Sequence, residues 1–222
     1  MLTMLLGLLF AQPAFSQDTV EIGVIRDEDV HVVQRMLYPK ESRSELGLHV
    51  GVMPFDAYLW TPNLQLSYDN HFREQLGFSL IAGGGWGFKT GAYRELEAPS
   101  IGVAPYAFRY LGSLLGGLEW APIYAKMNVD GARVIHFDVY GVARIGASVE
   151  QSVIPSGGIA VAPTVSPGLG MRLFLGERTA LRVELRDDLL VEYRKITQST
   201  EFKQNANVTV GLSTLSKRPE RR

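Results

Sequence analysis

The stretch that decides the fold is ALRVELRDDLLVE, residues 180–192. Its aliphatic and charged residues alternate, with Leu181, Val183, Leu185, Leu189 and Val191 set against Arg182, Glu184, Arg186 and Asp188. An alternation with a period of two places the two sets on opposite faces of a β-strand. One face of this strand must therefore meet apolar surroundings, and the other must meet polar partners.

The same period of two continues through the chain after residue 43 and predicts eight strands. Each strand sets apolar residues against Gly, Ser, Thr or charged residues. Leu111, Leu115 and Ile123 break the alternation of one of them. The predicted strands cover residues 44–52, 63–72, 76–88, 110–126, 134–148, 160–175, 180–192 and 207–215.

The connections between these strands alternate between short and long. The short ones are residues 73–75, 127–133 with the hairpin pair Asp130-Gly131, and 176–179. The long ones are residues 53–62, 89–109, 149–159 and 193–206. Short periplasmic turns and long outer loops are typical of outer-membrane barrels. The sequence therefore predicts an all-β fold, an eight-stranded antiparallel transmembrane β-barrel over residues 44–215.

The chemistry of the two faces separates this barrel from a soluble one. A lipocalin-like barrel has an apolar interior and a polar exterior. Here the polar face is rich in small residues, which suit a narrow lumen, whereas the other face is bulky and aliphatic. We therefore expect the aliphatic face to contact lipid, with interfacial aromatic residues at Tyr68, Trp86, Trp120 and Tyr124.

The predicted lumen carries six acids and four arginines, with His49, His71 and His136 among them. An isolated ion in a poorly hydrated interior is very costly, so these charges must pair. We expect a structural ion-pair network of Glu45, Asp69, Glu119, Asp138, Arg144, Arg172, Arg182, Glu184, Arg186 and Asp188.

The sequence gives little support to catalytic or cofactor chemistry. A net charge of −1 argues against nucleic acid as a partner, and the lack of Cys excludes a thiol nucleophile and a Cys-ligated metal. His136 and Asp138 share one face, as a catalytic pair would, but no Ser has the context of a nucleophile. The glycine run at residues 83–87 lacks the Lys-Ser/Thr of a phosphate loop. We expect no catalytic residues, no cofactor and no metal.

The termini predict export. Residues 1–16 read as a signal peptide with cleavage before Gln17, and no later apolar run is long enough for a transmembrane helix. Residues 17–43 form a predicted periplasmic segment, for which a short strand, a short helix and a lumen plug all fit the pattern. Residues 216–222 form a basic periplasmic tail.

Four stretches resemble a known family: VVQRMLYPK at 32–40, WAPIYAK at 120–126, HFD at 136–138 and ALRVELRD at 180–187. In these the chain resembles the outer-membrane β-barrel domain family of myxobacteria and related deltaproteobacteria. It departs from that family at Ala125, where Gly is common, and at Leu215, where a closing aromatic residue is expected. The resemblance implies the fold and an outer-membrane location, and it supplies no catalytic residues. Some members of the family belong to gliding-motility envelope complexes.

These observations favour a non-enzymatic structural or adaptor protein of the outer membrane that is not a pore. A lipid A-modifying enzyme and a small-solute porin are the alternatives. We expect the barrel to lie among outer-membrane lipid and lipopolysaccharide, to meet the barrel-assembly machinery during biogenesis, and to bind periplasmic or envelope proteins, with no nucleic acid partner.

Overall fold

The computed structural model describes residues 36–129, 133–153, 158–194 and 199–217. The predicted signal peptide, most of the predicted periplasmic segment and the end of the basic tail lie outside the described residues. The nine strands are β1 (Arg43–Met53), β2 (Leu59–His71), β3 (Leu76–Gly85), β4 (Phe88–Lys89), β5 (Phe108–Val129), β6 (Arg133–Ser152), β7 (Ile159–Phe174), β8 (Thr179–Arg194) and β9 (Ser199–Leu215). One helix, α1 (Gly91–Glu97), lies between β4 and β5.

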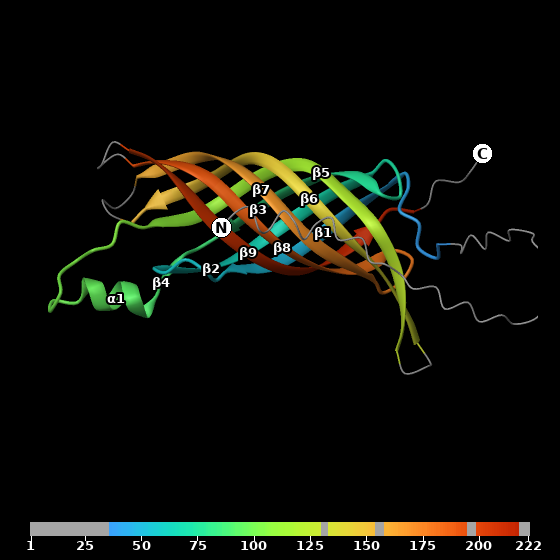
Figure 1. The fold of residues 1–222 in the computed structure, drawn as a ribbon, viewed down its shortest axis with the longest axis horizontal. Helices are drawn as coiled ribbons and strands as arrows, with labels where there is room; N and C mark the ends of the chain where they lie inside the picture. Colours follow the sequence, from blue (N-terminus) through green and yellow to red (C-terminus); the bar gives the residue numbers. More distant parts are fainter. Residues whose placement is uncertain (1–35, 130–132, 154–157, 195–198, 218–222) are drawn as a thin grey trace, which may run out of the picture. The chain divides into compact units, whose positions relative to one another are not determined.

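Eight of these strands close into a ring, which confirms the predicted barrel (Figure 1). Each strand of the ring is antiparallel to its neighbours, and β1 pairs with both β2 and β9 to close it. Leu48 on β1, for example, lies opposite Leu66 on one side and Leu212 on the other. The short strand β4 stands outside the ring and pairs only with the first two residues of β2, within the part of the chain that the structure describes.

The two faces of the ring have the predicted chemistry. Leu48, Leu66 and Leu212 are 52%, 55% and 54% exposed on the outside, and similar side chains from the other strands continue this apolar belt. The residues between them point inward and are buried. Ring closure pairs each strand on both sides at the level of the belt, and the belt places aliphatic groups against lipid. None of the helices in the described residues is long and apolar enough to cross a membrane.

Several strands are longer than predicted. β2 begins at Leu59 rather than Asn63, and β9 begins at Ser199 rather than Asn207. β3 instead ends at Gly85, short of the predicted Phe88. The connections of the loop end are therefore residues 54–58, 86–107, 153–158 and 195–198, and only one of them is long. The prediction of long outer loops was wrong for the other three, because pairing continues past the aliphatic belt that produces the sequence pattern.

Two bulges explain most of the irregularity in β5. The register with β6 shifts between Tyr110 and Gly112 and again between Trp120 and Ile123. A bulge inserts one extra residue and so reverses which residues face outward. Leu111 is the extra residue of the first bulge, and the second turns Ile123 to the outside. Leu115 is different, since it faces the lumen and is fully buried.

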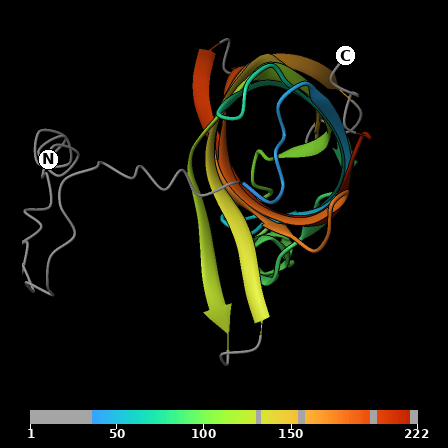
Figure 2. The same cartoon turned by 90° about the vertical axis from the view of Figure 1, so that its right-hand side faces the viewer.

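The two ends of the barrel differ. The turn end carries the connections 72–75 and 175–178, together with residues 36–42, which we call the crossing segment. Figure 2 looks into this end and shows the crossing segment over its opening. At the loop end, Thr90 caps α1, and Tyr93 of the helix packs with Leu59 and Ala107 over the rim.

A hairpin projects from the turn end (Figures 1 and 2). The pairing of β3 with β5 ends at Leu76 opposite Trp120, whereas β5 continues beside β6 to Val129. Among the described strands, the part of β5 from Pro122 onward therefore pairs on one side alone. Ile123 and Met127 on it are about half exposed, at 53% and 50%.

A charge on the outward face of β8 should be costly. Replacing Val183 with Arg should lower the free energy of unfolding by about 2–4 kcal/mol, because the guanidinium would lie in hydrocarbon. Leu175→Arg, in the turn after β7, should cost only ~0–1 kcal/mol, because it lies near the interface. Urea unfolding of the protein folded into lipid vesicles, followed by Trp fluorescence, measures both. Equal costs would contradict the assignment of this face to lipid.

Candidate functional site in the barrel lumen

The structure brings all ten predicted charged residues together inside the barrel. None of them is more than 6% exposed. They come from six strands of the ring, and the alternation of each strand turns them inward while their neighbours form the belt. The lumen is therefore filled by ionic side chains at its centre.

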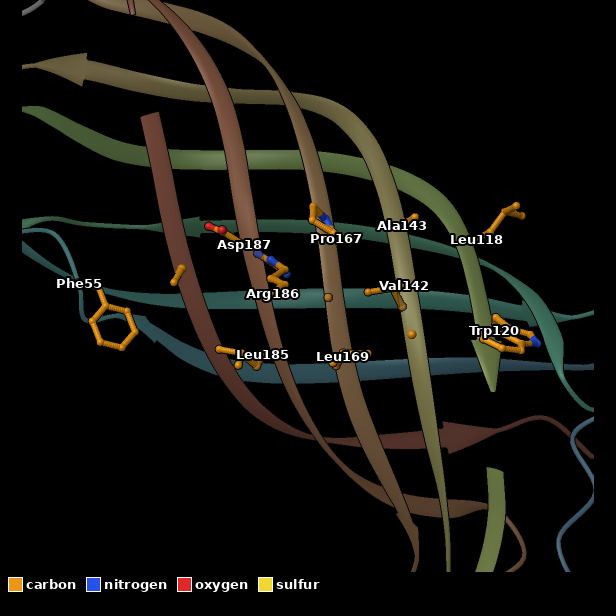
Figure 3. Close-up of a pocket in the computed structure, with 13 residues that line it drawn as sticks. Phe55, Leu118, Trp120, Val142, Ala143, Pro167, Leu169, Leu185, Arg186 and Asp187 are labelled. Atoms are coloured by element: carbon orange, nitrogen blue, oxygen red, sulfur yellow. The ribbon is translucent and has the colours of Figure 1, made fainter. Parts of the chain in front are cut away.

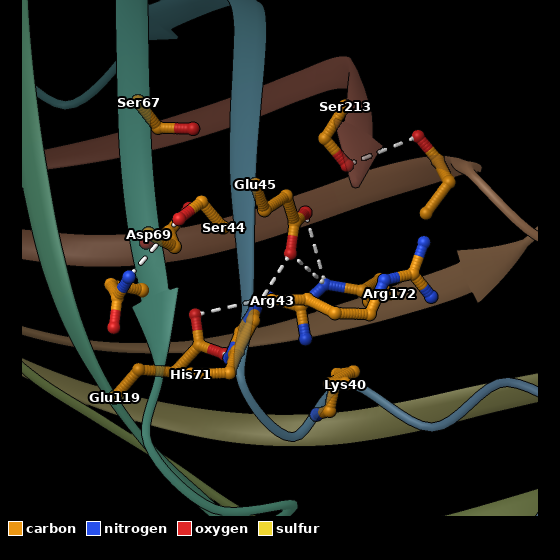
Figure 4. A network of polar contacts seen from close by, with 12 residues as sticks. Lys40, Arg43, Ser44, Glu45, Ser67, Asp69, His71, Glu119, Arg172 and Ser213 are labelled. Atoms are coloured by element: carbon orange, nitrogen blue, oxygen red, sulfur yellow. Dashed lines mark hydrogen bonds and ion pairs between the residues drawn. The ribbon is translucent and has the colours of Figure 1, made fainter. Parts of the chain in front are cut away.

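Arg172 on β7 joins three carboxylates from three other strands. Its guanidinium lies 3.1 Å from Glu45, 2.8 Å from Glu119 and 3.0 Å from Asp138. Figure 4 shows this arginine among side chains that cross the barrel from opposite walls. Hydrogen bonds from a guanidinium to carboxylates are among the strongest that side chains form.

Arg182 on β8 makes a second junction beside the first. It pairs with Asp69 on β2, and it lies 3.1 Å from Glu119 and 3.4 Å from Glu45. Its Nε also donates to the hydroxyl of Tyr140 at 3.2 Å. Glu45 and Glu119 thus contact both arginines, so the two junctions form one network.

Tyr140 links this network to a third ion pair. Its hydroxyl donates to Glu184 at 3.2 Å, and Glu184 accepts two hydrogen bonds from Arg144 at 2.7 and 3.1 Å. Gly170 makes room for the ring, because a Cβ at that position would lie 2.3 Å from Cζ of Tyr140. A side chain at position 170 would therefore displace the tyrosine that joins the two parts.

A second layer lies toward the loop end. Arg186 is 3.1 Å from Asp188 and donates to Gln65 across the lumen at 2.7 Å. Asp188 also accepts from Ser166 on the neighbouring strand at 2.5 Å. The lumen therefore passes from fully ionic junctions to a mixed layer of ions, amides and hydroxyls.

The three histidines take different places. His71 contacts Glu45 at 3.0 Å and so belongs to the ionic network, while His49 lies 2.9 Å from the hydroxyl of Ser67. His136 packs against the rings of Tyr38 and Tyr124. Asp138, which the sequence places on the same face and in the ion-pair network, accepts from Lys40 and Arg172.

The turn end is closed by residues that the sequence placed outside the barrel. Lys40 is 3% exposed and pairs with Asp138, while its backbone N–H donates to Glu74. Arg43, the first residue of β1, is also buried, and it donates to the backbone oxygens of Ser216 and Glu177. β1 begins at Arg43, and within the described residues the crossing segment enters the mouth of the lumen, as one of the three possibilities for residues 17–43 would have it.

A cluster at the loop end was missed altogether. Lys203 lies 3.0 Å from Glu150 and 3.2 Å from Glu192, and both carboxylates are buried. All three residues lie in or next to predicted loops. Asp188 and Glu192 both lie on the inward face of β8. This alternation could have predicted that the polar lumen reaches Glu192.

The predicted interfacial aromatic residues divide into two groups. Tyr68, Trp86 and Trp120 are exposed on the outside of the barrel, at 42%, 47% and 58%. Tyr124 is only half-exposed, because it lies on the projecting hairpin and packs against His136 and Phe174. The bulge after Trp120 turns Ile123 outward and Tyr124 to the opposite face of the hairpin.

The outer wall carries an apolar groove of ≈700 Å³ (Figure 3). Leu118, Trp120, Leu169 and Leu185 lie along it. The pairing of β7 with β8 is interrupted beside the groove, because Val165 pairs with Leu189 and the next pair is Gly168 with Arg186. Pro167 lies in this interruption, and it has no N–H to donate. The groove belongs to the lipid-facing surface rather than to the lumen.

Metal chemistry receives no support from the site. Among the residues that the structure describes, no group of three or more His, Cys, Asp or Glu could hold a metal ion. The carboxylates of the lumen centre are instead occupied by arginine and lysine.

A closed ring of antiparallel strands, an aliphatic outer belt and an ionic interior together define a transmembrane β-barrel of the outer-membrane type. The chain is an outer-membrane β-barrel protein.

No protein-family model matches the chain, and no curated protein matches it. Among solved structures it is similar to the outer membrane protein OprG of Pseudomonas aeruginosa, with 11% identity over 82% of this chain and 99% of that chain and a TM-score of 0.48. It is also similar to the attachment invasion locus protein Ail of Yersinia pestis, with 12% identity over 79% and 99% and a TM-score of 0.42. A third is the N-terminal β-barrel domain of OprF of Pseudomonas aeruginosa, with 10% identity over 79% and 98% and a TM-score of 0.44.

Removing one arginine from the network should destabilise the barrel strongly. Arg182→Ala should lower the free energy of unfolding by about 3–5 kcal/mol, because it leaves buried carboxylates without their cation. Arg73→Ala, an exposed arginine in the turn after β2, should change it by less than ~0.5 kcal/mol. Urea unfolding in lipid vesicles compares the two.

A second substitution tests the cause of that loss. Adding Asp69→Asn to Arg182→Ala removes a stranded charge, so the double variant should recover part of the lost stability. A double variant that is less stable than Arg182→Ala would argue against the charge explanation.

Proposed function

We propose that this protein is a non-enzymatic, non-conducting structural adaptor of the outer membrane. The observation that carries the proposal is the filled lumen. Arg144, Arg172 and Arg182 are among the largest fully buried side chains of the chain, and their carboxylate partners come from opposite walls. An eight-stranded ring is just wide enough for its side chains to fill it. Such an interior braces the wall and leaves no aqueous path.

The closed lumen should not conduct ions. Planar-bilayer recordings of the purified protein should show no steady channel of porin size, whereas a known porin in the same membrane should show regular steps. Arg182→Ala should lower thermal stability before it produces conductance, because the remaining side chains still fill the ring. Regular, large single-channel steps from the unmodified protein would favour the small-solute porin instead.

The adaptor part of the proposal is supported by the projecting hairpin. Short turns of outer-membrane barrels face the periplasm, so we assign the turn end, with the hairpin, to that side. From Pro122 onward β5 offers backbone groups on one edge, flanked by the exposed side chains of Ile123 and Met127. An unpaired edge with alternate apolar side chains is a template for strand addition. The partner we propose is an envelope protein that contributes an extended strand to β5.

The family resemblance supports the same proposal, because some members of that myxobacterial family belong to envelope complexes, including those of gliding motility. On this proposal lipopolysaccharide and outer-membrane lipid surround the belt, and the barrel-assembly machinery inserts the chain.

A pull-down tests the adaptor proposal. Protein solubilised from the outer membrane should retain envelope proteins, and the combined change Ile123→Glu and Met127→Glu should reduce the retained amount at least about tenfold, because charge replaces the apolar contacts. Val103→Glu is the matched control, since Val103 is 53% exposed like Ile123 but lies at the loop end. Retention that is unchanged in the hairpin variant would contradict this assignment.

A further inference from the structure

A cavity of ≈260 Å³ lies at the loop end of the barrel, away from the ionic junctions. Three aromatic residues line it, namely Tyr58, Tyr106 and Phe108. Glu192 and Lys203 line it as well, from β8 and β9. Its walls thus combine aromatic rings with charged groups, in a volume that suits a small molecule of a few carbon atoms.

The charges around this cavity do not balance. Glu150 and Glu192 share one cation, since Nζ of Lys203 lies 3.0 Å from Oε1 of Glu150 and 3.2 Å from Oε1 of Glu192. Asp56 adds a further carboxyl group to the lining. The lining itself therefore holds two carboxyl groups, those of Asp56 and Glu192, against one lysine, which is an excess of acid.

Two buried oxygens show where the excess lies. Glu150 is fully buried and Glu192 is 2% exposed. Neither carboxylate oxygen of Glu192 accepts a hydrogen bond from the described residues. A buried carboxylate oxygen without a donor is costly, so a donor with positive charge would be stabilised next to it.

The aromatic rings favour an organic cation over a metal ion. Nζ of Lys203 already lies 6.0 Å from the centre of the Phe108 ring, and the Tyr106 ring packs edge-on against Phe108 at 5.0 Å. Aromatic faces attract ammonium groups, and a metal ion would instead require a cluster of ligands that the described residues lack.

We propose that the loop-end cavity binds a small primary ammonium ion, with its N–H groups donating to Glu192 and its carbon chain against the aromatic residues. A primary ammonium has three N–H donors, which is enough to reach both carboxylate oxygens of Glu192. A quaternary ammonium supplies none and would use the rings alone. The preference for a primary over a quaternary ammonium follows from the carboxylate oxygens that lack a donor. It distinguishes the site from one built of aromatic rings alone.

The first experiment uses n-butylammonium chloride as the probe, with 1-butanol and tetramethylammonium chloride as matched controls. Isothermal titration calorimetry of the detergent-purified full chain should detect saturable binding of butylammonium, no binding of butanol, and binding of tetramethylammonium at least about tenfold weaker. Equal binding of butylammonium and butanol, or no binding of either, would overturn the proposal. The remaining explanation would be a proton shared between the carboxyl groups of Glu150 and Glu192.

Substitutions locate the site. Glu192→Gln should weaken butylammonium binding about tenfold or more, because it removes the charged acceptor in the cavity wall. Glu177→Gln is the matched control, since Glu177 is an exposed residue at the turn end. The heat-modifiable gel shift of folded barrels verifies that each variant has folded. Binding that is equal in both variants would place the probe elsewhere and overturn the assignment.

A rescue experiment remains informative if Glu192→Gln fails to fold. Lys203→Ala removes the shared cation, so butylammonium should raise the unfolding temperature of this variant more than that of the unmodified protein. Butanol at the same concentration should not do so. An equal effect of butylammonium on both proteins would contradict a site at Lys203.

The ammonium group could come from a free amine or from the ethanolamine headgroup of a lipid. Reconstitution into phosphatidylethanolamine and into phosphatidylcholine distinguishes them. If butylammonium binds equally in both bilayers, the ligand is a free amine; if phosphatidylethanolamine alone competes with it, the headgroup is the source. Either result supports the same ammonium site.

Discussion

Arg172 and Arg182 lie in a lumen from which water is largely excluded, and there every charge must be matched by another side chain. This constraint shapes the rest of the structure. The carboxylates that match the two arginines come from β1, β2, β5 and β6, so the network is complete only when the ring is closed. Glycines on the inner face, such as Gly170 under Tyr140, supply the space that the large side chains need.

Such a network contributes more to the choice of register than to net stability. Desolvation of two buried ions offsets much of their attraction, whereas breaking a pair is very unfavourable. A slip of β8 by one residue would turn Arg182 and Glu184 toward lipid and Leu181 and Val183 into the lumen. The belt residues of β8 are aliphatic, so they fit many registers almost equally well. The ionic interior therefore selects the correct register of this strand.

The buried carboxylates at the two ends of the barrel have different partners. At the turn end Lys40 enters the mouth and pairs with Asp138, while Arg43 donates to backbone oxygens. At the loop end Glu150 and Glu192 share Lys203 and retain free acceptors beside aromatic walls. One end is thus closed by the chain itself, and the other keeps the capacity to bind a cation. This asymmetry, together with the hairpin of β5 and β6, gives a filled barrel two chemically distinct surfaces.

The sequence by itself determined the strands and their faces, because an aliphatic belt against a polar lumen requires a period of two. The alternation of each predicted strand indicated which side chains point inward, and all ten predicted ions lie in the lumen. The resemblance to a myxobacterial family stays a prediction. Tertiary structure decided which acid meets which arginine, since Asp69 and Arg182 are far apart in the chain and only ring closure joins them. It also decided the roles of Lys40 and Lys203, which lie beyond the aliphatic belt, where alternation fades because lipid no longer imposes it.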